Sequence, residues 1–94
     1  MKGYSIFKAK KLIKISLEHD GKRVQSIKIH GDFFFYPEEK LSDLEKNLEG
    51  TELTAVALSA RIRGFLLGGA SAFGFDENEL STAILQAAQE GSVP

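Results

Sequence analysis

The sequence predicts an α+β fold, in which a three-stranded antiparallel β-meander is covered on one face by about three helices. Residues 1–30 contain three segments where apolar and polar residues alternate, and three helical patterns follow them within residues 37–90. Because strands and helices do not alternate along the chain, an antiparallel sheet layered with helices is favoured over a parallel arrangement. With 94 residues, the chain (1–94) is expected to form a single domain with one modest core.

The first two strands are predicted at residues 4–9 and 12–18. In the second strand, Ile13, Ile15 and Leu17 alternate with polar residues, so one face of the sheet is expected to be solvated. Asp20-Gly21 is a strong signal for a hairpin turn because glycine tolerates the positive φ that such turns need.

The third strand is predicted at residues 22–30 and should pair antiparallel with the second. Its alternation divides six residues between two faces: Gln25, Ile27 and Ile29 on one, and Val24, Ser26 and Lys28 on the other. Residues 1–30 together are therefore expected to form the meander.

The first helix is predicted at residues 37–49. Pro37 suits a first helical turn, and Glu38 and Glu39 suit the positive end of the helix dipole. A single apolar stripe runs along the helix before Gly50 and consists of Leu41, Leu44 and Leu48.

The second helix is predicted at residues 52–63, with Thr51 as its cap. Its apolar residues fall on two nearly opposite sides: Leu53, Val56, Ala57 and Ala60 on one, and Leu58 and Ile62 on the other. Such a helix is expected to be enclosed between other elements. The third helix, at residues 77–90, begins with the capping-box pattern of Asp76 and Glu79, and residues 91–94 are expected to fray.

The composition excludes several classes of protein. The chain has no cysteine, so disulfides, thiolate metal sites and cysteine nucleophiles are absent. The N-terminal residues lack the apolar region of a secretion signal, and the longest apolar stretch, residues 64–75, is too short and too rich in glycine to span a membrane. A cytoplasmic location is predicted.

Charge is unevenly distributed along the chain. Residues 1–30 carry eight lysines and arginines against Glu18 and Asp20, a net charge of +6, and the remaining residues carry −7. A basic sheet could bind nucleic acid, but a solvated sheet whose outward residues are lysines has the same sequence pattern. The second interpretation is favoured, and nucleic-acid binding is kept as the alternative function.

No familiar active-site pattern is complete. Gly69 and Gly74 have the glycine spacing of a phosphate loop, but Phe75-Asp76 stands where lysine and a hydroxyl residue are needed. His19 and His30 belong to no metal-binding pair, and the paired carboxylates open predicted helices, where acids are favoured in any case. No catalytic, cofactor-binding or metal-binding residue is therefore assigned.

Four consecutive aromatic residues, Phe33, Phe34, Phe35 and Tyr36, lie between the last predicted strand and the first helix. Alternating directions along an extended segment would bury about two of them and leave the others exposed, and exposed aromatic clusters tend to be interaction sites. The other interpretation is that the segment curls so that sheet and helices enclose all four.

The chain also resembles the C-terminal, or accessory, domain of lipoate-protein ligases. The resemblance is carried by the strand Ile27-Lys28-Ile29, which leads into Gly31-Asp32-Phe33-Phe34, and by the acidic helix that ends at Leu48-Glu49-Gly50. The preceding hairpin is also similar, so that the resemblance covers nearly the whole chain. Phe35-Tyr36 stands where many relatives have a glycine, so this loop departs from the family pattern.

The resemblance implies a stand-alone accessory subunit, since Met1 opens the domain directly. Such a subunit pairs with a catalytic subunit that binds lipoate, ATP and Mg, and it supports formation of lipoyl-adenylate without supplying a catalytic side chain. The lipoyl group then passes to acceptor domains of 2-oxoacid dehydrogenases or to the glycine cleavage H-protein. An independent enzyme and an excised piece of a fused ligase are the remaining alternatives.

The predicted partner-binding residues follow from the aromatic segment and the basic sheet. Phe33, Phe34, Phe35 and Tyr36 are expected to anchor the partner, and Gly31 and Asp32 are expected to set the path of the loop. Lys14 and Lys28 are expected to steer the approach of the partner.

Overall fold

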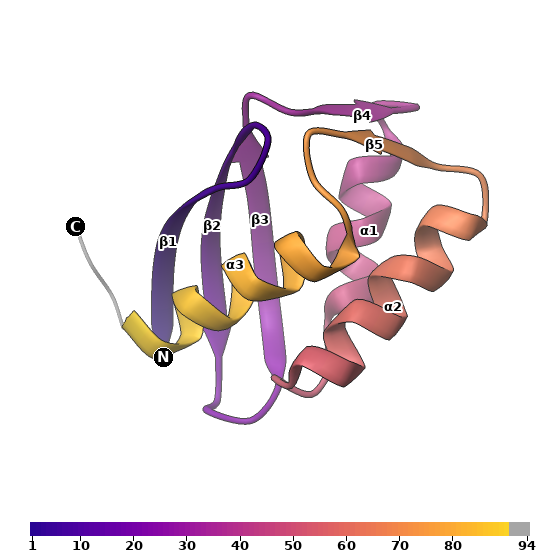
Figure 1. The fold of residues 1–94 in the computed structure, drawn as a ribbon. Coiled ribbons are helices and arrows are strands. Elements are labelled where there is room, and N and C mark those ends of the chain that lie inside the picture. Colours follow the sequence, from indigo (N-terminus) through magenta and orange to yellow (C-terminus); the bar gives the residue numbers. More distant parts are fainter. Residues whose placement is uncertain (91–94) are drawn as a thin grey trace.

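The computed structural model describes residues 1–90 and confirms the α+β class (Figure 1). The predicted fraying of residues 91–94 lies outside the described residues. A three-stranded antiparallel sheet in the order β1-β2-β3 is formed by β1 (Lys2–Lys8), β2 (Leu12–His19) and β3 (Val24–Gly31). The helices are α1 (Lys40–Leu48), α2 (Ala55–Leu67) and α3 (Glu77–Glu90). A small second sheet, which was not predicted, pairs β4 (Phe34–Tyr36) with β5 (Ser71–Phe73).

The helices pack on one side of the three-stranded sheet. Helix α3 crosses β1 and β2, α1 packs beside β3, and α2 packs against α1 and α3 (Figure 1). The core between them is built from the inward residues of the sheet and the apolar stripes of the helices, including Ile13, Ile15, Ile29, Leu44, Ile62 and Ile84. No helix within residues 1–90 is long and apolar enough to cross a membrane.

Helix α3 approaches β1 very closely. A Cβ atom added at Gly3 would lie 2.0 Å from the Ala87 carbonyl oxygen, so glycine is what allows this contact. The buried Ser5 hydroxyl donates a hydrogen bond to the Ala83 carbonyl oxygen, at 2.7 Å. The close contact fixes the angle at which α3 crosses the sheet.

Strand β3 corrects one prediction. Val24 is buried together with Ile27 and Ile29, whereas Gln25 is exposed. The pairing explains this result, because Glu18 lies opposite Ser26 while His19 lies opposite Val24, which leaves Gln25 as an extra residue. A β-bulge of this kind reverses the alternation beyond it, and simple period-two counting cannot detect it.

The predicted Asp20-Gly21 turn joins β2 to β3. The Asp20 carboxylate accepts hydrogen bonds from the backbone N–H groups of Lys22, at 2.9 Å, and of Arg23, at 2.8 Å. These two bonds stabilise the charged carboxylate and hold the pKa of Asp20 below its ordinary value.

Asp20 should therefore make stability depend on pH in the acid range. Because its pKa is lower in the folded chain than in the unfolded chain, its contribution is present above the unfolded pKa and is lost as the pH falls through the folded pKa. Asp20→Asn should lower the free energy of unfolding at neutral pH. Urea titrations at several pH values check this, and a gap between the two proteins that stays constant down to about pH 2 would contradict it.

Two helix starts differ from the prediction. Helix α1 begins at Lys40 because Pro37, Glu38 and Glu39 form a turn in which the Lys40 N–H bonds to the Pro37 carbonyl oxygen. Helix α2 begins at Ala55, and its cap is Thr54, whose hydroxyl accepts from the Ala57 N–H at 3.2 Å. Thr51 is instead buried before the helix.

The apolar residues of α2 were expected to be enclosed on two sides, and this expectation holds on one side only, where α2 packs against α1 and α3. Leu58 and Ile62 are fully buried, whereas Val56 on the other side is 81% exposed. The capping box of α3 is confirmed by two reciprocal hydrogen bonds. Asp76 N–H donates to Glu79 Oε1 at 2.9 Å, and Glu79 N–H donates to Asp76 Oδ1 at 2.8 Å.

Candidate functional site

The four consecutive aromatic residues divide into an inner and an outer pair. Phe34 and Tyr36 are 71% and 70% exposed, whereas Phe35 is 5% exposed and Phe33 is half-buried. Strand β4 is extended, and side chains alternate along an extended strand. The expectation that two of the rings point outward is therefore met, and the alternative in which all four are enclosed is not.

The pairing of β4 with β5 adds a third aromatic ring to the outer face. Phe34 lies opposite Phe73, which is 62% exposed, and Tyr36 lies opposite Ser71. Residues directly opposite in an antiparallel pair project from the same face. We call Phe34, Tyr36 and Phe73 the aromatic surface.

The inner rings connect the two-stranded sheet to the rest of the domain. The Phe35 ring lies 6.4 Å from the Phe65 ring of α2, between ring centroids. The Phe33 ring meets the Phe75 ring edge-on, at 5.0 Å between centroids, which is a favourable aromatic geometry. Phe33 and Phe35 thus support the aromatic surface from inside the chain, so Phe34 and Tyr36 are the members of the predicted anchor set that a partner can reach.

Backbone hydrogen bonds fix the small sheet against the β1–β2 hairpin. The Asp32 N–H donates to the Leu12 carbonyl oxygen at 3.0 Å, and the Lys11 N–H donates to the Gly74 carbonyl oxygen at 3.1 Å. Gly31 has φ +151°, and an added Cβ would lie 2.0 Å from the Leu12 carbonyl oxygen. Gly31 and Asp32 therefore set the path from β3 into β4 in this structure.

Lys14 and Lys28 lie on the face of the three-stranded sheet that α3 does not cover. Lys14 pairs with His30 across the strands, and the Lys28 ammonium lies 3.9 Å from the Glu45 carboxylate. Both side chains are exposed. Their predicted steering role remains a prediction.

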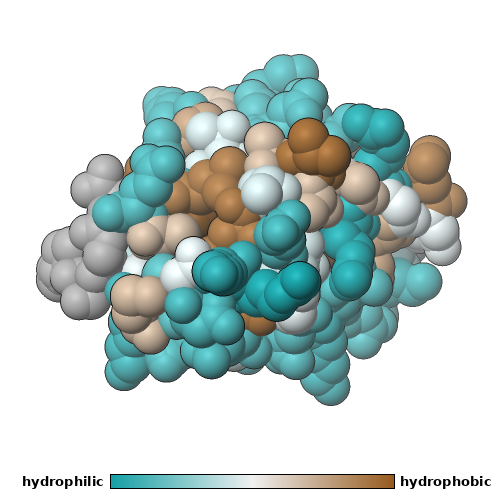
Figure 2. Space-filling view, turned by 90° about the horizontal axis from the view of Figure 1, so that it is seen from below, coloured by the Kyte–Doolittle hydropathy of each residue, from teal (hydrophilic) through white to brown (hydrophobic). Residues whose placement is uncertain are grey.

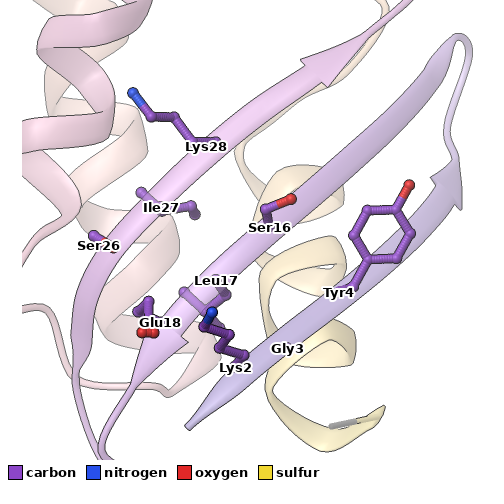
Figure 3. A pocket seen from close by; sticks show the side chains of 9 residues that line it. All are labelled: Lys2, Gly3, Tyr4, Ser16, Leu17, Glu18, Ser26, Ile27 and Lys28. Carbon is purple, nitrogen blue, oxygen red and sulfur yellow. The ribbon is translucent and has the colours of Figure 1, made fainter. Parts of the chain in front are cut away.

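The same face of the sheet is hollowed near its lower end (Figure 3). The hollow has a volume of about 370 Å³ and is lined by polar side chains that include Lys2, Tyr4, Ser16 and Glu18. Lysines and a glutamate stand side by side there, so the hollow has no single strong charge.

The two histidines, His19 and His30, lie in different surroundings. His19 is buried, and its Nδ1 accepts a hydrogen bond from the Gly21 N–H at 3.0 Å. His30 is exposed beside Lys14. The segment from Gly69 to Gly74 contains strand β5, so it is not a phosphate-binding loop. Within residues 1–90, no three carboxylate or histidine side chains come together as metal ligands.

Sequence reasoning missed Phe73 as a member of the candidate site. Strand β5 has only three residues, Ser71, Ala72 and Phe73, which is too few to show an alternating pattern. Its neighbouring glycines, Gly69 and Gly74, have the spacing of a phosphate loop and give no signal for a strand between them. The available signal was a second aromatic-containing segment between glycines that could pair with β4.

The chain exposes other apolar side chains besides the aromatic surface. Ile6, Val56 and Leu67 are exposed. Figure 2 views the molecule from the end opposite β4 and β5, and hydrophobic residues are visible near the centre of that end. The aromatic surface differs from these in gathering three rings on two paired strands, and aromatic residues are enriched where proteins bind one another.

An α+β domain that holds three aromatic rings in solvent on a small, firmly attached sheet has the features of a protein-binding domain. Residues 9–84 match the family model described as bacterial lipoate protein ligase C-terminus. The match covers most of the chain, so the chain belongs to this family.

The chain is also similar to two proteins from one organism. The chain is 43% identical over 51 residues to lipoate-protein ligase A subunit 2 of Thermoplasma acidophilum, an alignment that covers 53% of this chain and about half, 54%, of the relative. It also superposes, with a TM-score of 0.79 and 33% identity, on a chain from the solved structure of a bi-partite lipoate protein ligase and its E2 lipoyl domain from the same organism. That superposition covers 89% of this chain and 94% of the other.

Proposed function

We propose that this chain is the accessory, non-catalytic subunit of a two-part lipoate-protein ligase. In this role it supports ATP-dependent formation of lipoyl-adenylate by a separate catalytic subunit, which binds lipoate, ATP and Mg. The proposal is supported by the family of the chain and by its similarity to nearly the full length of one chain of a bi-partite ligase structure. The observation in the chain itself that carries it is the outward aromatic surface of Phe34, Tyr36 and Phe73.

The physical contribution of such a subunit is closure. Lipoyl-adenylate is a mixed anhydride, which water hydrolyses. A second subunit that stabilises the enclosed conformation of the catalytic site therefore protects lipoyl-adenylate from hydrolysis. The aromatic surface supplies the apolar contact area that holds the two subunits together, because buried aromatic residues dominate interface energies. Lys14 and Lys28 raise the rate of encounter with an acidic surface more than they strengthen the complex.

The test is pyrophosphate release from lipoate and ATP by the catalytic subunit, measured with and without this chain. Addition of the chain should raise the rate about tenfold or more, which corresponds to roughly 1.4 kcal/mol of activation free energy. Transfer from preformed lipoyl-adenylate to a lipoyl acceptor domain serves as the control and should change little. Equal rates of pyrophosphate release with and without the chain would end the proposal.

A further inference from the structure

The two edge strands of the three-stranded sheet, β1 and β3, differ in whether their outward backbone groups have hydrogen-bond partners. Strand β3 has its outer edge occupied: the Ile29 N–H donates to the Glu45 carboxylate at 2.8 Å, and the Val24 N–H donates to the Thr51 carbonyl oxygen at 3.0 Å. The Val24 carbonyl oxygen accepts from the Gly50 N–H at 2.7 Å. One edge of the sheet is thus closed by α1 and by the segment that follows it.

The direction of the backbone groups in β1 follows from the same bonds. The Ile29 N–H points away from β2, so Ile29 and its partner Ile15 do not exchange hydrogen bonds, and Ile15 must bond to β1 instead. Its partner there is Ser5. The alternation continues along β2. The His19 N–H, which has the same parity as Ile15, also donates away from β3, to the Met1 carbonyl oxygen.

The backbone N–H and C=O groups of Tyr4 and Ile6 therefore point away from β2, at the open edge of the sheet. The N–H and C=O groups of Gly3, Ser5 and Phe7 are used by β2, and those of Tyr4 and Ile6 have no backbone partner within residues 1–90. Edge strands are usually blunted by proline, by bulges, by a covering segment or by charged side chains such as lysine. In β1 the lysines, Lys2 and Lys8, stand only at the two ends of the strand. Strand β1 contains no proline, and its pairing with β2 is unbroken from Lys2 to Lys8.

We propose that β1 is a docking strand that accepts an extended segment of the catalytic subunit as a fourth strand of the sheet. This inference rests on the proposed function for the identity of the partner. An extended chain is required, because only a strand can pair with N–H and C=O groups on alternate residues. The structure thus offers the partner two separate contacts, the aromatic surface and the edge of β1.

The side chains around β1 specify the chemistry of the incoming strand. On the uncovered face, Lys8 lies at one end of β1 and Lys14 lies opposite Ile6 on β2, while Lys2, at the other end of β1, lies opposite Glu18. On the covered face, Phe7 is only half-buried. A segment in which carboxylates alternate with apolar residues would pair with the lysines on one face and complete the burial of Phe7 on the other.

A second copy of this chain fits the edge less well. A symmetric antiparallel pair that used all of the outward residues would place Tyr4 opposite Ile6, and Lys2 would then stand opposite Lys8 at both ends. Like charges directly opposite each other are destabilising. The charge pattern therefore favours an acidic partner strand over another β1.

Amide hydrogen exchange tests the proposal without any substitution. In the isolated chain, the amides of Tyr4 and Ile6 should exchange rapidly, while those of Ser5 and Phe7 are protected. In the complex with the catalytic subunit, exchange at Tyr4 and Ile6 should slow by about tenfold or more, because each amide gains a hydrogen-bond partner.

The other outcomes separate the two proposals. If the complex forms and Tyr4 and Ile6 remain unprotected, the docking strand is wrong and the proposed function stands. If these amides are already protected in the isolated chain, the edge is covered without the partner and the docking strand is again wrong. If no complex forms, the proposed function and the docking strand fail together.

A proline variant gives a second readout. Ile6→Pro removes an outward N–H together with the exposed Ile6 side chain. An edge strand tolerates proline at such a position, and the substitution should weaken the complex about tenfold or more. Ala55→Pro is the matched control, because Ala55 is the first residue of α2, where proline is favoured. It should leave the affinity unchanged. Wild-type affinity in a folded Ile6→Pro chain would overturn the proposal.

Discussion

Replacing Phe34 and Phe73 together by serine is expected to weaken the complex with the catalytic subunit about 100-fold or more. The two rings lie directly opposite each other on β4 and β5 and are both largely exposed in the free chain. Truncation of a central aromatic anchor commonly costs about 2 kcal/mol or more, so the loss of two corresponds to at least this change in affinity. Isothermal titration calorimetry with the catalytic subunit measures the effect.

The same substitutions should leave the fold intact, because exposed residues outside caps and cores contribute little to stability. Val56→Ser is the control: Val56 is 81% exposed in the first turn of α2, and its substitution removes exposed apolar surface outside β4 and β5. It should bind like the wild type. Wild-type affinity in the double variant, with the melting temperature unchanged, would show that the aromatic surface is not the contact.

Much of the fold could be predicted because its strongest patterns are local. The alternation of Ile13, Ile15 and Leu17 predicts a half-buried strand, and Asp76 with Glu79 fixes the start of α3. The errors arose where a tertiary contact overrides the local pattern. The bulge at Gln25 exists only in the pairing of β2 with β3, and the start of α2 depends on which of two threonines, Thr51 or Thr54, the surrounding chain buries.

The candidate site was predictable only in part, for a related reason. Alternation along residues 33–36 predicts that two rings face outward, but it does not say which neighbouring strand will pair with them. Phe73 follows Phe34 by many residues, and its place beside Phe34 is created by the pairing of β4 with β5. The free edge of β1 could not be predicted either. Which backbone groups of β1 face outward follows from the hydrogen bond between the Ile29 N–H and the Glu45 carboxylate, a contact between β3 and α1.

Gly31→Ala is expected to lower the free energy of unfolding by about 3 kcal/mol, although the substitution adds a single methyl group. Gly31 has φ +151°, a conformation that residues with a side chain rarely adopt, and the new Cβ would lie 2.0 Å from the Leu12 carbonyl oxygen. That oxygen also accepts the hydrogen bond from the Asp32 N–H, so relief of the clash would break the bond that leads β3 into β4. Urea-induced unfolding followed by circular dichroism measures the change.

Gly64→Ala makes the same chemical change where the backbone and the space permit it. Gly64 lies inside α2, and nothing stands within 4 Å of an added Cβ. Alanine there should raise the free energy of unfolding by about 0.5–1 kcal/mol, because glycine is the weaker helix former. If the two substitutions change the free energy of unfolding in opposite directions, the cost of Gly31→Ala arises at the junction between β3 and β4 and not from the added methyl group as such. A loss below about 1 kcal/mol at Gly31 would instead show that the junction can move, and that the aromatic surface is not rigidly held.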